Sequence, residues 1–366
     1  MLSFDRDHAA GRRIPGLVRV LGALAAAALT VAACGDDGND TTASQPPSTL
    51  TDDRAAGETV GNQPSDDATA DETAPEDETV PDDGPGPFEP FTIIDDLGSA
   101  VRVESIDRII PLDGDIAEVV FALGYGDNVV ATDLSATYPP EADALPEIGY
   151  QRALSAESIA AFDPTLLLAT EVAGPPEALD DLRRLGYPLV IVPSEATAEG
   201  PGDKIRAVAA ALGDGEAGER LASEVDASIA SAARDEESAV RVAALYLRGD
   251  TTQLVLGAAS ATHWIIEAAG GVDVSVELGI SEAEPINAEA ILAANPDVLL
   301  VTTTGLASVG GIDGLAGIGS LGETEAGLNG QVVAFDDQLL LGNGPRVAEV
   351  LAGLSAQIEA IATAST

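Results

Sequence analysis

The sequence predicts an α/β protein of two similar Rossmann-like lobes joined by one long α-helix. A seventeen-residue stretch occurs twice, at 154–170 and 286–302, with eight identical positions. Around each copy, strand-like and helix-like segments alternate at the spacing of a mostly parallel sheet. A helical stretch at 201–238 separates the two halves. Two lobes imply a cleft between them, and clefts at domain interfaces are where small ligands bind.

Each copy of the repeat predicts a short amphipathic helix followed by a buried strand. Ser155 and Asn287 are expected to cap the helices, and Glu157 and Glu289 fall in the first helical turns. A proline ends each helix before its strand begins. The two glutamates therefore occupy equivalent positions, one in each lobe.

The other elements follow from apolar periodicity and turn residues. In the first lobe, 91–200, we expect helices and strands in turn: strands 101–103, 108–111, 128–133 and 189–192, and helices 113–123 and 175–185. The connector contains a helix at 203–212 and a long helix from 216 to about 237, which should limit lobe motion. In the second lobe, 239–366, we expect strands, a helix, a loop and a final helix: strands 241–247 and 332–335, a helix at 261–269, a glycine-rich loop at 305–319, and a last helix opened by Pro345.

The first part of the chain predicts export. Basic residues precede a short apolar run at 20–33, which is typical of a secretory signal peptide over 1–33. The run resembles a bacterial lipobox, which implies lipidation of Cys34 and anchoring outside the cytoplasm. An ordinary secretory signal with an incidental cysteine is the alternative. Because Cys34 is the only cysteine, no intrachain disulfide can form.

Residues 34–90 predict an acidic, disordered tether. They are rich in Asp, Glu, Thr, Pro, Gly and Ser, with too few apolar side chains to offset the entropy of ordering. The formal net charge of the chain is −45, and the acidity continues beyond the tether. Such a charge argues against nucleic acid and anionic lipid as partners, so membrane contact is expected through the lipid anchor only.

Together, the lipobox, tether, lobes and connecting helix resemble the substrate-binding lipoproteins of bacterial ABC importers. The class is the one that carries ferric siderophores, cobalamin and heme. Seven segments are similar to hemin-binding proteins in particular: 111–118, 137–142, 148–157, 174–177, 245–249, 309–315 and 335–346. The resemblance covers 106–361 and implies the class III periplasmic-binding-protein fold. It also implies a monomer that delivers heme to permease and ATPase subunits and is not an enzyme.

Tyr246 and Arg248 are the first candidate heme-binding residues. They lie two apart near the end of a strand, so their side chains share one face. A phenolate oxygen suits ferric iron. A nearby guanidinium would favour the ionised phenol or pair with a heme propionate. The pair resembles the axial tyrosine and its partner in Gram-positive relatives. The alternative is a tyrosine packed under a loop with Arg248 solvated.

Tyr138 is the second candidate iron ligand. It precedes Pro139 and Pro140 in a first-lobe loop and resembles the axial tyrosine of Gram-negative hemin-binding proteins. A ring packed against proline is the alternative. If both tyrosines face the cleft, one ligates iron and the other stacks or closes the opposite side.

The first lobe lacks the histidine that some related heme binders supply near 149–152. Tyr150 or Arg152 is left as a substitute, and Arg152 could bind a propionate or form an ordinary surface ion pair. His263, the only histidine after the signal peptide, is expected to be a helix-start residue. Arg346 is a further candidate lining the cleft.

In the family that the chain resembles, glutamates at the positions of Glu157 and Glu289 dock on arginines of the permease. The alternative is that both only complement their helix dipoles.

Other functions are less well supported by the sequence. A ferric siderophore or cobalamin binding protein of the same class is the main alternative, but siderophore pockets need several cations and this chain has few. An enzyme would need a nucleophile or metal motif, and no nucleophile elbow, histidine-rich spacing or catalytic cysteine occurs. A purely adhesive protein would not require paired glutamates or converging tyrosines.

Overall fold

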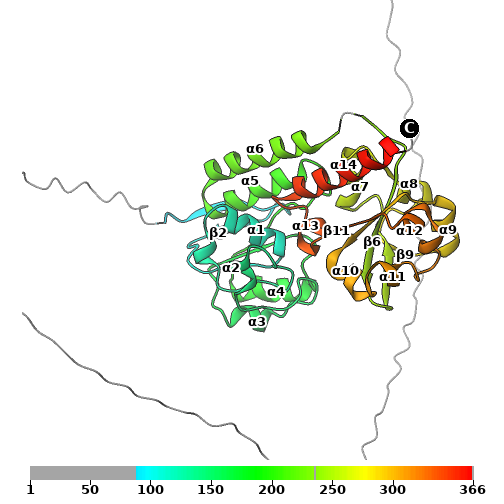
Figure 1. Ribbon diagram of the computed structural model, residues 1–366. Helices are drawn as coiled ribbons and strands as arrows, with labels where there is room; N and C mark the ends of the chain where they lie inside the picture. Colours follow the sequence, from blue (N-terminus) through cyan, green and yellow to red (C-terminus); the bar gives the residue numbers. More distant parts are fainter. Residues whose placement is uncertain (1–87, 235, 365–366) are drawn as a thin grey trace, which may run out of the picture. The chain divides into compact units, whose positions relative to one another are not determined.

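The computed structural model describes residues 88–234 and 236–364 (Figure 1). The predicted signal peptide, Cys34 and nearly all of the predicted tether lie outside the described residues, and those predictions remain predictions.

The first lobe is built on a parallel sheet with the strand order β3-β4-β5. All of its strand residues are buried: β3 (Ile109–Pro111), β4 (Leu166–Ala169) and β5 (Leu189–Ile191). Other elements surround it: the antiparallel pair β1 (Phe91–Ile94) and β2 (Ala100–Val103), helices α1 (Gly114–Ala122), α2 (Pro140–Asp143), α3 (Ala156–Ala160) and α4 (Pro176–Leu185), and the 3-10 helix η1 (Gly126–Asn128).

The strand expected at 128–133 is reduced to isolated bridges. Val129 bridges to Ile109 in β3, but Thr132 bridges to Glu147 instead. Because the segment changes partner after a few residues, no continuous ladder forms.

The second lobe is built around β6 (Arg241–Arg248), which changes partner midway. Its first half pairs in parallel with β8 (Val272–Asp273) and β10 (Val298–Thr302), and β10 pairs in parallel with β11 (Val332–Phe335). Its second half, which carries Tyr246, pairs antiparallel with β7 (Thr252–Val255). β7 in turn pairs with β9 (Glu284–Pro285).

Short helices cover this second sheet: α7 (Ala261–Ala268), α8 (Val274–Leu278), α9 (Ala288–Ala294), α10 (Thr303–Ser308), α11 (Gly311–Leu315), η2 (Leu321–Glu323) and α12 (Glu325–Asn329). The glycine-rich stretch expected to be a loop at 305–319 therefore forms most of α10 and all of α11. The hydroxyl oxygen of Thr302 starts α10 by accepting the Gly305 N–H at 3.0 Å.

The two copies of the repeat fold alike, which confirms the two-lobe α/β prediction. One copy forms α3 and β4, and the other forms α9 and β10. The predicted caps are also confirmed, since Ser155 accepts the N–H of Ser158 at 3.4 Å and Asn287 accepts that of Ala290 at 3.0 Å. Each copy supplies a strand with neighbours on both sides.

The lobes are joined through α5 (Gly200–Leu212) and α6 (Gly215–Ala232), which pack against each other. The long helix α6 ends before residue 237, where we expected it to end. The reason is that the chain after Ala232 bonds to the second lobe: the N–H of Arg234 donates to the carbonyl of Ala268, and that of Ser238 to Gly270.

The last helix, α14 (Val347–Ala364), packs against α6 and α7. It begins two residues after Pro345, because the Val347 N–H closes a turn on the Gly344 carbonyl. Among the described residues, α14 alone is long and apolar enough to cross a membrane by length and composition. Leu351 and Ile358 are nevertheless fully buried in the core, which is the pattern of a core helix.

The segment between β11 and α14 contacts the first lobe, and Figure 1 shows its helix α13 (Asp337–Leu341) between the two lobes. Nearby, the ammonium of Lys204 in α5 contacts the carboxylate of Asp115 in α1 and donates to the Gly342 carbonyl at 2.9 Å. The side-chain amide of Asn343 donates to the Glu195 carbonyl at 3.0 Å. The C-terminal part of the chain is thus fixed to the first lobe as well as the second.

We expect Lys204→Met to lower the free energy of unfolding by about 3–5 kcal/mol, because it leaves the buried Asp115 carboxylate without its cation. Urea unfolding followed by circular dichroism measures this loss. The matched control is Arg184→Met, which breaks an exposed pair with Asp181 and should cost no more than about 1 kcal/mol. Equal losses in the two variants would contradict the prediction.

Candidate ligand-binding site

Tyr246 and Arg248 form a stacked pair at the end of β6. The guanidinium carbon of Arg248 lies 4.4 Å from the centre of the Tyr246 ring, which is a cation–π distance. Arg248 also donates to the Leu247 carbonyl at 2.8 Å and forms an ion pair with Asp337 in α13. Arg248 is therefore anchored rather than freely solvated, and Tyr246 lies outside the buried core.

Tyr138 and Arg346 form a second such pair, and it joins the two lobes. The guanidinium carbon of Arg346 lies 3.5 Å from the Tyr138 ring centre. Arg346 also donates two hydrogen bonds to the carboxylate of Glu118 in α1, from Nε at 2.9 Å and from Nη2 at 3.0 Å. Burial raises the pKa of Glu118, and the bonds from Arg346 oppose that rise. Tyr138 as a whole remains 39% exposed.

Gln338 holds the backbone beside Tyr138. Its carbonyl oxygen accepts the N–H groups of Thr137 and Tyr138, each at 2.8 Å. Its amide nitrogen donates to the carbonyls of Gly114 and Tyr138 at 2.8 and 3.2 Å. This side chain comes from the second lobe, and the groups that it binds come from the first.

Each tyrosine–arginine pair has one member bonded to the first turn of α13. Asp337 binds Arg248, which covers Tyr246, and the next residue, Gln338, binds the loop of Tyr138. Adjacent residues of one short helix therefore contact the two predicted iron ligands: Gln338 bonds directly to the Tyr138 backbone, and Asp337 pairs with the arginine that stacks on Tyr246. Among the described residues, no group of three or more His, Cys, Asp and Glu side chains is arranged to hold a metal ion.

Asp133 connects the Tyr138 loop to the segment that holds Tyr150 and Arg152. Its carboxylate accepts the Ser135 hydroxyl at 2.8 Å and the Gln151 N–H at 3.2 Å. Burial raises the pKa of Asp133 to about 6, although these two bonds oppose the shift. Tyr150 and Arg152 are exposed, and no contact within the described residues joins them to either tyrosine–arginine pair.

The close approach of the Tyr138 loop to α1 requires a glycine at position 114. A Cβ atom there would lie 2.4 Å from the Ser135 carbonyl oxygen, which is closer than atoms can pack. The Gly114 N–H in turn donates to the Ser135 hydroxyl at 2.9 Å. The loop is thus held against the start of α1 by this contact as well as by Gln338.

Glu157 and Glu289 are both exposed in the first turns of α3 and α9. Neither carboxylate has an ion pair among the described residues. His263 lies near the start of α7, where its Nδ1 is 2.9 Å from the Asp273 carboxylate. It is bound within the second lobe and has no contact with the tyrosines.

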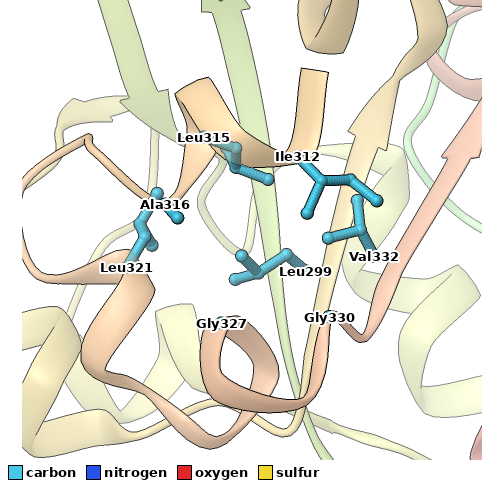
Figure 2. A pocket seen from close by; sticks show the side chains of 8 residues that line it. All are labelled: Leu299, Ile312, Leu315, Ala316, Leu321, Gly327, Gly330 and Val332. Carbon is cyan, nitrogen blue, oxygen red and sulfur yellow. The ribbon is translucent and has the colours of Figure 1, made fainter. Parts of the chain in front are cut away.

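Two hollows in the structure lie apart from these residues. A small cavity of about 10 Å³ inside the second lobe has apolar walls and holds at most about one water (Figure 2). A wider surface hollow of about 360 Å³ lies in the first lobe beside β1, β5 and α5. None of the candidate site residues lines either one, so the predicted cleft between the lobes remains a prediction.

Sequence reasoning missed Gln338, Asp337, Glu118 and Asp133. The first three lie in segments already singled out by resemblance, 111–118 and 335–346. Nothing local marks the roles of Gln338, Asp337 and Glu118, because each bonds to a residue far away along the chain. Asp133 acts closer by, on Ser135 and Gln151.

Comparison with known proteins finds one matching family and relatives that are binding proteins. The profile of the periplasmic binding protein family matches residues 109–339. The chain is 48% identical to the periplasmic heme-binding protein RhuT from Roseiflexus sp. RS-1, covering 70% of this chain and 99% of that one, with a TM-score of 0.68. It is 34% identical to the heme-binding protein HmuT, covering 75% and 92%, with a TM-score of 0.69. The vitamin B12-binding protein of Vibrio cholerae is 23% identical over 205 residues, which are 55% of this chain and 72% of that protein.

We expect Asp133 to make stability depend on pH. Its folded-state pKa of about 6 lies above its ordinary value of 3.8, so the folded chain binds this proton more readily. Its contribution to stability is therefore full below about pH 4 and is lost as the pH rises through about 6. Relative to Asp133→Asn, the wild-type free energy of unfolding should fall by roughly 2–3 kcal/mol between pH 3.5 and 7.

Urea unfolding at a series of pH values measures this difference. The control Asp143→Asn removes an exposed carboxylate from the same lobe. A wild-type profile that differs from Asp133→Asn only by a constant would show the expectation to be wrong.

Proposed function

Because the chain belongs to the periplasmic binding protein family, we propose that it is an extracytoplasmic, lipid-anchored protein that captures ferric heme and delivers it to an ABC permease. Its neighbours of known structure support heme as the ligand, since RhuT and HmuT are heme-binding proteins of at least 34% identity. The proposal assigns the chain a binding and transport role and no catalysis. It acts as a monomer, with the permease and its ATPase as partners.

The observation that carries this proposal is that adjacent residues of α13 bind one member of each of two tyrosine–arginine pairs, with one tyrosine from each lobe. Phenol oxygens are hard donors that suit ferric iron, and tyrosine is an established axial heme ligand. In the proposed complex, Tyr246 or Tyr138 ligates the iron. The other tyrosine stacks on or closes the opposite side of the ring.

The three arginines have different proposed roles. Arg248 and Arg346 already pair with Asp337 and Glu118, so they stabilise the tyrosines and can share a propionate only in part. Arg152 is exposed and has no ion pair among the described residues, which favours it as the propionate partner. Tyr150 beside it adds an aromatic edge to the first-lobe side of the site.

Glu157 and Glu289 are proposed to dock the loaded protein on permease arginines. Their equivalent places in the repeat, their exposure and their lack of an ion pair among the described residues support this role. Their positions in first helical turns also complement the helix dipoles, but that role needs no match between lobes.

Cobalamin is the alternative ligand, because the curated relatives include vitamin B12-binding proteins. A ferric siderophore is less well supported, since Arg248, Arg346 and Lys204 are already paired with carboxylates. The choice between heme and cobalamin depends on whether an oxygen donor of the protein binds the metal.

We expect the wild-type protein to shift the Soret band of micromolar hemin and to leave cyanocobalamin unbound. Replacing the iron ligand, by Tyr246→Phe or Tyr138→Phe, should remove the phenolate-to-iron absorption. It should also weaken binding beyond the roughly 10–100-fold that changes outside the ligand shell typically cost. Spectrophotometric titration measures both effects.

The matched control for these variants is Tyr187→Phe, at a partly buried first-lobe tyrosine that packs on the core. It should retain the wild-type spectrum. Cyanocobalamin binding without a hemin Soret shift would replace heme by the alternative ligand.

We expect the double variant Glu157→Ala/Glu289→Ala to bind hemin normally and to lose most of its hemin uptake in cells. The physical reason is that it removes both carboxylates proposed to pair with the permease, while the heme site is unchanged. The matched control is Glu177→Ala/Glu325→Ala, which removes exposed first-turn glutamates of α4 and α12. Uptake at the wild-type rate in the first double variant would rule out the docking role.

A further inference from the structure

The amide of Gln338 crosses from the second lobe to the first with both of its ends engaged. Its oxygen faces three donors: the N–H groups of Thr137 and Tyr138 and the Thr137 hydroxyl. Its nitrogen faces three acceptors: the carbonyls of Gly114 and Tyr138 and the carboxylate of Glu118. The side chain is only 7% exposed. Only a group with a donor at one end and an acceptor at the other satisfies this arrangement.

We infer that Gln338 is a positioning residue for heme capture, which holds Tyr138 of the first lobe in fixed relation to the Tyr246–Arg248 pair of the second. This inference rests on the proposed function and deepens it. Gln338 touches no ligand itself in this assignment, and it acts through the backbone of Tyr138.

Gln338 binds the backbone of Tyr138 on both sides of its Cα atom. Gln338 accepts the N–H of Tyr138 at 2.8 Å and donates to its carbonyl at 3.2 Å. Arg346, eight residues further along the chain, lies over the ring at 3.5 Å. Backbone and ring are therefore both held by the second lobe, although Tyr138 belongs to a first-lobe loop and is 39% exposed.

The same helix turn holds the other tyrosine. Asp337 forms an ion pair with Arg248, which stacks on Tyr246. Asp336 caps this turn by accepting the Leu339 N–H at 3.2 Å. Since Asp337 and Gln338 are adjacent in one capped turn, a displacement of α13 moves both tyrosines together. Small displacements of groups that hold a metal ligand are costly, because its orientation sets the bond to the metal.

The hydrogen-bond pattern explains why position 338 carries glutamine. Gln338→Met keeps the length of the side chain and removes every hydrogen bond. Gln338→Glu keeps the acceptor toward Thr137 and Tyr138 but places a carboxylate oxygen against two carbonyls and the Glu118 carboxylate. Both variants should loosen the loop, by different routes.

The test is a double-mutant cycle in the full chain, with hemin affinity and the absorption spectrum as readouts. Gln338→Met should weaken hemin binding about 10–100-fold and alter the iron spectrum, as loss of outer-shell support does. In the Tyr138→Ala background the same change should cost less than about twofold, because that background has neither the phenol oxygen nor the ring that Gln338 positions. The matched control Gln357→Met breaks a second-lobe bond to Gln331 and should leave affinity and spectrum unchanged.

A second readout separates this inference from the choice of ligand. In the protein without heme, the amides of Thr137 and Tyr138 should exchange with deuterium at least about tenfold faster in Gln338→Met than in Gln357→Met. Equal losses of hemin affinity in the two tyrosine backgrounds would overturn the inference, as would unchanged amide exchange. If the wild type binds no hemin, the proposed function fails. Faster amide exchange in Gln338→Met would then still show that Gln338 holds the Tyr138 loop.

Discussion

The contacts between the C-terminal segment and the start of α1 set the geometry of the candidate site. Gln338 and Arg346 reach from the second lobe to Tyr138 and Glu118 in the first. Other contacts hold this loop to α1 and the C-terminal segment to the first lobe, but these two side chains reach Tyr138 itself. A ligand gripped by oxygens from both lobes needs the relation between Tyr138 and Tyr246 to be set in advance, because a preorganised site spends less binding energy on ordering.

This interface buries more acidic than basic side chains. Asp113, Asp115, Glu118 and Asp133 are all buried near the start of α1, where the two buried or half-buried cations are Lys204 and Arg346. Glu118 and Asp115 pair with cations, whereas Asp113 accepts the Thr170 hydroxyl, and burial and the Asp115 carboxylate raise its pKa well above the ordinary value. Buried ion pairs return little net stability after desolvation. The charges at this interface are better explained by the geometry that they impose than by the stability that they add.

The accuracy of the sequence-based fold prediction followed the range of the interactions involved. The repeat copies, their caps and the strand at 332–335 were predicted well, because capping and apolar periodicity act within about ten residues. The strand expected at 128–133 failed because its partner changes from β3 to residues near 147. The glycine-rich stretch was expected to be a loop because glycine has a weak helix propensity. In the structure the Thr302 cap helps α10 to form within it.

By itself, the sequence determined that the chain forms two related α/β lobes, that a tyrosine and an arginine share one strand face, and that one glutamate marks each lobe. These features arise from neighbours along the chain. Only the tertiary structure decided that Gln338 would grip the loop of Tyr138, 200 residues away, and that Arg346 would lie over its ring. The reason is that one hydrogen bond between distant segments leaves no periodic trace in the sequence, since it depends on how the two lobes pack in space.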